Sequence, residues 1–266
     1  MKRRDFLTSS SAVLASLLST QFVSSALADI SDNDQLATQA KPASVGHKFT
    51  ADGQVRHFPG NTIICHIDKN SEAFRALLDI NVLLERSNLL KRIVPVPPAS
   101  YHMTVFEGVV DEVRKPGYWP DDLPVDASLE ACNTLFANKL RGFDLASRLP
   151  FRMKPLPIEA QNKREIILLE PFDAHENEKL RVLRNRLSAL LHLKQNNHDH
   201  YAFHITLNYL YDWPSEAESA RYDEIHRQSV AMFIERSPII DLQYPEFCLL
   251  EDMYEFKRQF YLQNYA

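Results

Sequence analysis

The sequence predicts an α+β protein of two similar lobes, each an antiparallel sheet with helices, that share a central cleft. Three observations lead to this fold class. A unit made of a strand, a helix and a second strand occurs twice, and each second strand contains a His-x-Thr tripeptide: His102-Met103-Thr104 in the first unit and His204-Ile205-Thr206 in the second. The chain has 266 residues, 45% hydrophobic and 24% charged, so it can bury a large core.

The first unit covers residues 62–110. Residues 62–67 are rich in β-branched side chains and predict a strand. The next segment, residues 71–86, predicts a helix capped by Ser71, with apolar residues at helical spacing: Phe74, Leu77, Leu78, Val82 and Leu83. A short strand at residues 92–96 stops at two prolines, and residues 100–110 predict the strand that carries the first tripeptide.

The second unit repeats this order. Residues 164–170 predict a strand, and residues 173–193 predict a long helix with one apolar face: Leu180, Leu183, Leu187, Leu190 and Leu191. Residues 201–211 then predict the strand that carries the second tripeptide. The other expected elements are helices at 126–140 and 215–235, a loop at 115–120, and extended segments at 151–159, 239–250 and 254–262.

The N-terminal part has the order of a signal peptide. Lys2, Arg3 and Arg4 precede a short apolar, Ser-rich stretch, and Ala26-Leu27-Ala28 is typical of a cleavage site. The Arg3-Arg4-x-Phe6-Leu7 pattern is similar to twin-arginine signals, so residues 1–28 predict export, to the periplasm, without stable membrane anchoring. Residues 29–60 are polar and predict a tether or an N-terminal wrap, and residues 61–266 form the expected bilobal domain.

The charge and the glycine pattern exclude several classes of ligand. The formal net charge is −5, which does not attract a long phosphate backbone, so duplex DNA is not expected as a partner. The six glycines do not form a P-loop or a dinucleotide-binding fingerprint, and no cofactor is expected. A small phosphate ester held by a few local donors remains compatible with this composition. The oligomeric state has no signal in the sequence.

The three cysteines, Cys65, Cys132 and Cys248, are widely spaced and form no C-x-x-C pair. We expect buried free thiols, although a single bridge such as Cys65–Cys248 stays open as an alternative. Cys132 lies in an amphipathic helical pattern, which indicates a core position rather than a nucleophile.

The two tripeptides indicate acid–base chemistry. In a strand, side chains two positions apart lie on the same face, so each tripeptide presents an imidazole beside a hydroxyl. If His102 and His204 face each other, one can accept a proton from water or a ribose hydroxyl while the other gives a proton to the leaving oxygen. Thr104 and Thr206 would then donate hydrogen bonds to the phosphate oxygens. This predicts metal-independent cleavage of a phosphodiester.

With these paired tripeptides the sequence resembles the 2H phosphoesterase superfamily, whose name refers to two H-x-[ST] motifs. The Phe58-Pro59-Gly60-Asn61-Thr62 lead-in is similar to that of one uncharacterised branch. The resemblance implies a bilobal α+β fold, His102 and His204 as catalytic acid and base, Thr104 and Thr206 as phosphate donors, and a 2′,3′-cyclic phosphodiester of a small nucleotide or short RNA as substrate. The signal peptide and an insertion at residues 115–124 depart from the well-studied branches.

Two other functions stay open at this point. His198-Asp199-His200, together with His204, could present imidazoles and a carboxylate to a transition metal, as in a metal-dependent hydrolase. Alternatively, the shared cleft could bind a nucleotide or an RNA end without turnover.

Several further residues are candidates for substrate contact. Tyr101 and Tyr201 precede the two tripeptides and could stack on a base or ribose, but tyrosine is also a favoured packing residue in strands. His66, at the end of the first expected strand, and the pair Lys163-Arg164 are candidate phosphate contacts, and a solvated surface position is an equal alternative for them.

Overall fold

The computed structural model describes residues 40–265 of the chain. These residues form four helices and ten strands. The helices are α3 (Glu72–Glu85), α4 (Leu129–Arg141), α5 (Ala174–Leu191) and α6 (Glu216–Arg236). The strands are β1 (Gly60–His66), β2 (Ile93–Pro95), β3 (His102–Val110), β4 (Phe151–Pro155), β5 (Ile166–Pro171), β6 (His204–Thr206), β7 (Asn208–Leu210), β8 (Ile240–Leu242), β9 (Glu246–Leu250) and β10 (Phe256–Tyr261).

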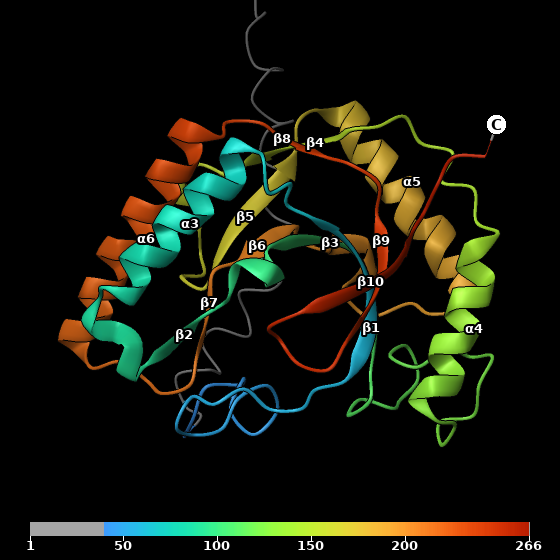
Figure 1. Ribbon diagram of the computed structural model, residues 1–266, viewed down its shortest axis with the longest axis horizontal. Coiled ribbons are helices and arrows are strands. Elements are labelled where there is room, and N and C mark those ends of the chain that lie inside the picture. Colours follow the sequence, from blue (N-terminus) through green and yellow to red (C-terminus); the bar gives the residue numbers. More distant parts are fainter. Residues whose placement is uncertain (1–39, 266) are drawn as a thin grey trace, which may run out of the picture. The chain divides into compact units, whose positions relative to one another are not determined.

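Eight strands form one curled antiparallel sheet in the order β10-β9-β1-β3-β6-β5-β4-β8, and β2 and β7 form a separate pair (Figure 1). The predicted α+β class and the antiparallel pairing are confirmed. The two expected sheets meet edge to edge at β3 and β6, so they make one continuous sheet. The two tripeptide strands are therefore direct neighbours.

The two repeated units are β1-α3-β3 and β5-α5-β6, as the sequence predicts. The strand and the helix that follow each unit in the chain pack with the other unit. Strand β4, which follows the first unit, pairs with β5, and β9, which follows the second unit, pairs with β1. The helices cross over in the same way, since α3 packs against α6 and α4 against α5 (Figure 1).

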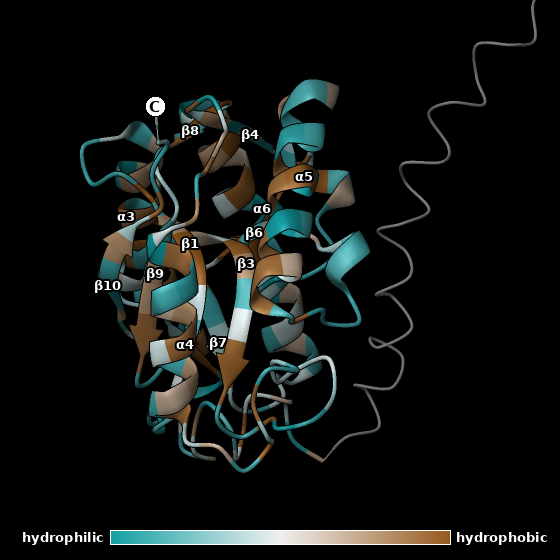
Figure 2. Cartoon of the chain, turned by 90° about the vertical axis from the view of Figure 1, so that its right-hand side faces the viewer, coloured by the Kyte–Doolittle hydropathy of each residue, from teal (hydrophilic) through white to brown (hydrophobic). Residues whose placement is uncertain are grey.

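The helices begin and end close to where the sequence places them. The Ser71 side chain caps α3 by accepting a hydrogen bond from the Phe74 N–H. Four of the five leucines predicted on the inner face of α5 are fully buried, and Leu190 is partly buried. Strand β9 is largely hydrophobic and the helices are mixed (Figure 2), as expected for strands beneath amphipathic helices.

The buried face of α3 differs from the predicted one. Leu78 and Val82 are exposed by 36% and 40%, whereas the smaller Ala73 and Ala76 are buried with Leu77, Ile80 and Leu84. The predicted face was therefore wrong at Leu78 and Val82, because the helix turns its buried stripe toward Ile80 and Leu84, which the predicted spacing left out.

The predicted strand at residues 201–211 is interrupted. Residues 204–206 pair with β3 and β5, and residues 208–210 turn to pair with β2. Before it, residues 198–200 form a single 3-10 turn. The second tripeptide thus occupies a three-residue strand, held on both sides by its neighbours.

Residues 40–58 pack against the sheet. Phe49 and Phe58 are buried in a small cluster with Leu250 and Met253. The predicted signal peptide and residues 29–39 lie outside the described residues. No helix within residues 40–265 is long and apolar enough to span a membrane. Cys65, Cys132 and Cys248 are buried and free, as expected.

Candidate functional site

The four tripeptide side chains meet where β3 pairs with β6. Met103 and Ile205 are the paired residues, and both side chains are fully buried on the helix-covered face. Continuing this antiparallel register places His102 opposite Thr206 and Thr104 opposite His204, on the other face. All four side chains are partly exposed there. The structure therefore brings the two predicted tripeptides into one group.

The two histidines are diagonal neighbours in this group. Diagonal positions on one face of an antiparallel pair have their side chains about 7–8 Å apart. The charge of a protonated His204 disfavours protonation of His102, which also indicates that the rings are close. A phosphate group placed between them can be reached by both imidazoles.

The two imidazole rings are oriented in the same way. Nδ1 of His102 lies 2.7 Å from the Ser100 carbonyl oxygen, and Nδ1 of His204 lies 2.9 Å from the Ala202 carbonyl oxygen. Each Nδ1–H donates to the backbone two residues earlier, so the neutral ring keeps the lone pair on Nε2. Both Nε2 atoms are then available to accept or, after protonation, to donate a proton.

Burial lowers the pKa of both rings. It lowers the pKa of His102 to about 3, against the favourable hydrogen bond to Ser100, and positive charge on His66 or His204 lowers it further. Burial also lowers the pKa of His204, with further contributions from the charges of Lys163 and Lys48. In the unliganded protein both imidazoles are therefore neutral at pH 7, and a bound phosphate anion would favour their protonation.

Two lysines contribute positive charge on the His204 side. Lys163 comes from the predicted Lys163-Arg164 pair, whereas Lys48 belongs to the N-terminal wrap and stands over the rings of Phe58 and Tyr209. Arg164 is engaged elsewhere, since it bonds Ser219 Oγ at 2.7 Å and stacks on Tyr222. The sequence patterns therefore indicated one of the two cations near His204 and missed the other.

His66 lies beside His102. The two residues are register partners on β1 and β3, and their ring centroids are 6.5 Å apart. Nδ1 of His66 is 2.9 Å from Oε2 of Glu246, a carboxylate whose side chain is only 6% exposed. Arg258 also contacts this oxygen, at 3.3 Å. The Phe256 ring also packs against His102, with a centroid distance of 4.2 Å.

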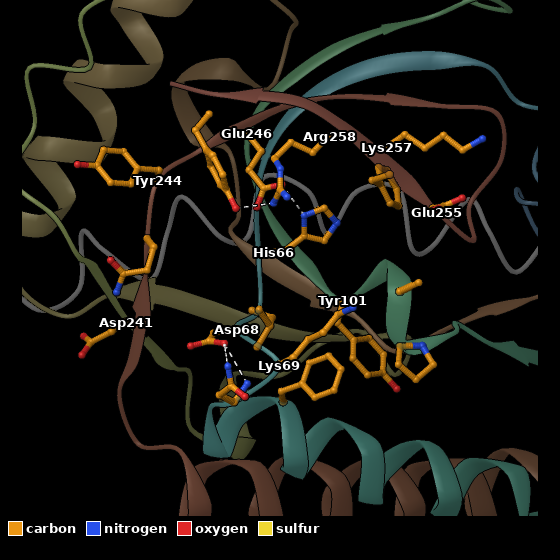
Figure 3. A pocket seen from close by; sticks show the side chains of 18 residues that line it. His66, Asp68, Lys69, Tyr101, Asp241, Tyr244, Glu246, Glu255, Lys257 and Arg258 are labelled. Atoms are coloured by element: carbon orange, nitrogen blue, oxygen red, sulfur yellow. Dashed lines mark hydrogen bonds and ion pairs between the residues drawn. The ribbon is translucent and has the colours of Figure 1, made fainter. Parts of the chain in front are cut away.

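A cavity of about 610 Å³ opens next to this group (Figure 3). His66 and Phe256 line it and also contact His102, whereas the four tripeptide side chains themselves lie outside its lining. A second cavity, of about 470 Å³, is lined by Lys163, Arg164 and the buried His226.

Tyr101 and Tyr201 both make packing contacts, and Tyr101 also lines the cavity of about 610 Å³. Tyr101 is 2% exposed, and its hydroxyl donates to the Leu77 carbonyl oxygen at 3.3 Å. Tyr201 is 6% exposed and lies beneath the Arg184 guanidinium, 4.3 Å from ring to Cζ. Burial raises the pKa of the Tyr201 hydroxyl, and an interaction with the Thr104 side chain opposes this rise, which indicates that the two side chains lie close together.

The predicted metal cluster does not assemble. His198 is buried and bonds Asn185 Oδ1 at 2.9 Å, and the exposed Asp199 pairs with Lys194. Within residues 40–265, a different set offers three ligand atoms within 4.8 Å of one another: His66, Glu246 and Cys248. Burial raises the pKa of the Cys248 thiol, which favours its protonated form, and the His66–Glu246 contact is already a hydrogen bond.

The residues that sequence reasoning missed are Lys48, Glu246, Phe256 and Arg258. They come from the N-terminal wrap and from β9 and β10, far from either tripeptide in the chain. Neither spacing nor composition distinguishes them from other residues of the same type, because only the pairing of β9 with β1 brings three of them to His66 and His102.

Comparisons with known proteins agree with this fold. Residues 48–164 match the family described as 2H-phosphodiest, Domain of unknown function (DUF1868). The crystal structure of ATU0111, a conserved protein of unknown function from Agrobacterium tumefaciens str. C58, superposes with a TM-score of 0.78 at 26% sequence identity and covers 87% of this chain and 98% of that chain. Uncharacterized protein 127L of Invertebrate iridescent virus 6 is 22% identical over 172 residues, which are 62% of this chain and 72% of the viral protein.

The family match includes the first tripeptide, and the structural alignment extends over most of the chain. Together with the two His-x-Thr strands side by side in one sheet, these comparisons identify the chain as a protein with the 2H phosphoesterase-like fold.

Proposed function

We propose that this protein is a metal-independent phosphodiesterase that cleaves a 2′,3′-cyclic phosphodiester of a small nucleotide or a short RNA. The observation that carries the proposal is the shared orientation of His102 and His204 on adjacent strands, with both Nδ1 atoms bonded to backbone and both Nε2 atoms available. The family match to 2H phosphodiesterases supports the type of reaction.

The proposed reaction uses the two imidazoles in concert. One neutral ring takes a proton from the attacking water as its oxygen bonds to phosphorus, and the other ring, protonated in the complex, gives a proton to the ribose oxygen as the P–O bond breaks. The product is a phosphate monoester with a free hydroxyl. Thr104 and Thr206 donate hydrogen bonds to the non-bridging oxygens, where negative charge accumulates. Lys48 and Lys163 add positive potential on the His204 side.

The test is turnover of His102→Ala and His204→Ala on 2′,3′-cyclic mononucleotides, followed by phosphorus NMR of the product. Each substitution should lower kcat by about 10²-fold or more, because it removes a general acid or base. His200→Ala is the matched control: His200 is exposed, lies four residues before His204, and belongs to the rival metal cluster. It should keep full activity, and a chelator should have no effect.

The alternatives predict different results. A metal enzyme would lose activity on chelation and in His200→Ala, and would regain it with added metal. A binding module would hold a cyclic nucleotide without turnover and would keep that affinity in His102→Ala or His204→Ala. Wild-type turnover in either histidine variant would contradict the proposed mechanism.

We further propose that the protein acts in the periplasm after twin-arginine export. The support is the N-terminal pattern of residues 1–28. Replacing Arg3 and Arg4 by Lys should leave the protein in the cytoplasmic fraction, uncleaved.

A further inference from the structure

The cavity of about 610 Å³ has the size of a small-molecule site and lies next to the proposed phosphate site. His66 and Phe256 connect the two, since both line the cavity and their ring centroids lie 6.5 Å and 4.2 Å from that of His102. In Figure 3, His66, Glu246 and Arg258 stand together on one wall, and Tyr101 lies on the opposite wall. A group attached to a phosphorus atom at His102 can therefore enter the cavity past His66.

The lining of the cavity favours an uncharged, ring-bearing group. Tyr244 and Tyr261 remain exposed by 40% and 42%, and their ring centroids are 6.5 Å apart with an interplanar angle of 64°. Arg258 lies over the Tyr261 ring at 4.3 Å, so a base can stack on the Tyr244 face beside Tyr261. The charges nearly balance, because four carboxylates face three cations: Asp68, Asp241, Glu246 and Glu255 against Lys69, Lys257 and Arg258. Such a lining gives no net attraction to a chain of phosphates.

The His66 ring is held in a fixed orientation. The buried Glu246 accepts a hydrogen bond from its Nδ1–H, and Arg258 contacts the same carboxylate. The neutral ring then keeps a lone pair on Nε2, and within residues 40–265 no other hydrogen bond to this ring is formed. A sugar hydroxyl is a matching donor for that nitrogen.

We propose that this cavity binds the nucleoside of the substrate, with its base against Tyr244 and Tyr261 and a ribose hydroxyl donating to Nε2 of His66. The inference rests on the proposed function for the position of the phosphorus. A nucleoside subsite in this cavity predicts a cyclic mononucleotide or an RNA end as the substrate. It does not fit a compound that would place additional phosphate groups in the cavity. His66 is then a substrate-binding residue, and Glu246 positions it.

The experiment compares two cyclic phosphates, 2′,3′-cyclic AMP and ethylene glycol cyclic phosphate, which has the same reacting ring without a nucleoside. His66→Ala should raise KM for 2′,3′-cyclic AMP about threefold to tenfold, the effect of one lost hydrogen bond, with kcat nearly unchanged. Tyr244→Ala should raise the same KM about tenfold through lost stacking. Neither should change kcat/KM for the small probe. The exposed, equally close His57–Glu251 pair provides the control, His57→Ala, which should change neither value.

Equal effects on both probes, or no effect on either, would overturn the nucleoside subsite. So would a lower KM for ADP-ribose 1″,2″-cyclic phosphate than for 2′,3′-cyclic AMP, because phosphates would then be preferred. Tyr244 is exposed, so its variant also covers the case in which His66→Ala does not fold.

If the wild-type protein turns over neither probe, the proposed function is refuted. The nucleoside subsite is then tested by binding alone. Calorimetry with adenosine 2′-monophosphate then decides: weaker binding in His66→Ala and Tyr244→Ala supports the subsite, and unchanged or absent binding overturns it.

Discussion

Much of the site geometry is fixed by single residues and their immediate neighbours. His102 and His204 each bond a backbone carbonyl two residues earlier in the chain, so ring orientation follows from local strand geometry. Their surroundings differ, however. Phe256 and His66 flank His102, whereas Lys48 and Lys163 act on His204. The two His-x-Thr tripeptides thus carry imidazoles with different electrostatic environments.

The tyrosine that precedes the second tripeptide offers a prediction at this scale. Tyr201→Phe removes the hydroxyl that interacts with Thr104, so the Thr104 hydroxyl loses a neighbour that helps to orient it toward the phosphate. We expect kcat/KM for a 2′,3′-cyclic nucleotide to fall about threefold to tenfold with little change in folding stability. Tyr211→Phe is the control, because Tyr211 lies outside the cavity lining and its hydroxyl bonds the Leu90 carbonyl oxygen. Equal activities of the two variants would contradict a supporting role for Tyr201.

At the scale of elements, helix α3 depends on its N-terminal cap. Ser71 accepts from the Phe74 N–H and donates to the Asp68 carbonyl oxygen. Ser71→Ala should lower the free energy of unfolding by about 1 kcal/mol, and Ser71→Gly by only a few tenths. Urea denaturation measures both, and Ser71→Asp should stay near wild type since aspartate also caps. A loss in Ser71→Asp as large as in Ser71→Ala would show that the cap bond is not what stabilises α3.

The elements also show how far the sequence determines the fold. Caps and periodicity are local, so Ser71, the leucines of α5 and both tripeptide strands could be located from the sequence. The exchange of β4 and β9 between the halves is not local, and neither is the meeting of Glu246 with His66 across 180 positions. No residue pattern marks such a pairing. The two tripeptide strands could therefore be predicted from the sequence, whereas the residues around them could be identified only from the structure.

In the molecule as a whole, the proposed catalytic residues lie where the two halves of the sheet meet, at the pairing of β3 with β6. Only the Met103–Ile205 pair defines the register of these two strands, and both residues are buried by the helix-covered core. The separation of the histidines therefore depends on the packing of the entire sheet. Substitutions far from the site that loosen either half can change activity through this distance alone.

The molecule as a whole should lose stability in acid, because burial lowers the pKa of four histidines: His102, His198, His204 and His226. In the unfolded chain a histidine takes up a proton near pH 6.5, whereas His102 in the folded protein does so only at about pH 3. Between these values the unfolded state binds more protons. The stability that depends on these neutral histidines is therefore fully present above about pH 6.5, and it is lost as the pH decreases toward 3.

His102 alone should account for a loss of up to about 2 kcal/mol between pH 7 and pH 5, an upper bound since part of its ring meets solvent. Urea denaturation at both pH values measures the loss in the wild type and in His102→Gln, which cannot take up this proton and should lose less. Thr104→Val, on the same strand and without a titrating group, should keep the wild-type difference. If all three proteins lose the same stability between pH 7 and pH 5, the His102 imidazole is not held neutral by burial, and the environment assigned to it is wrong.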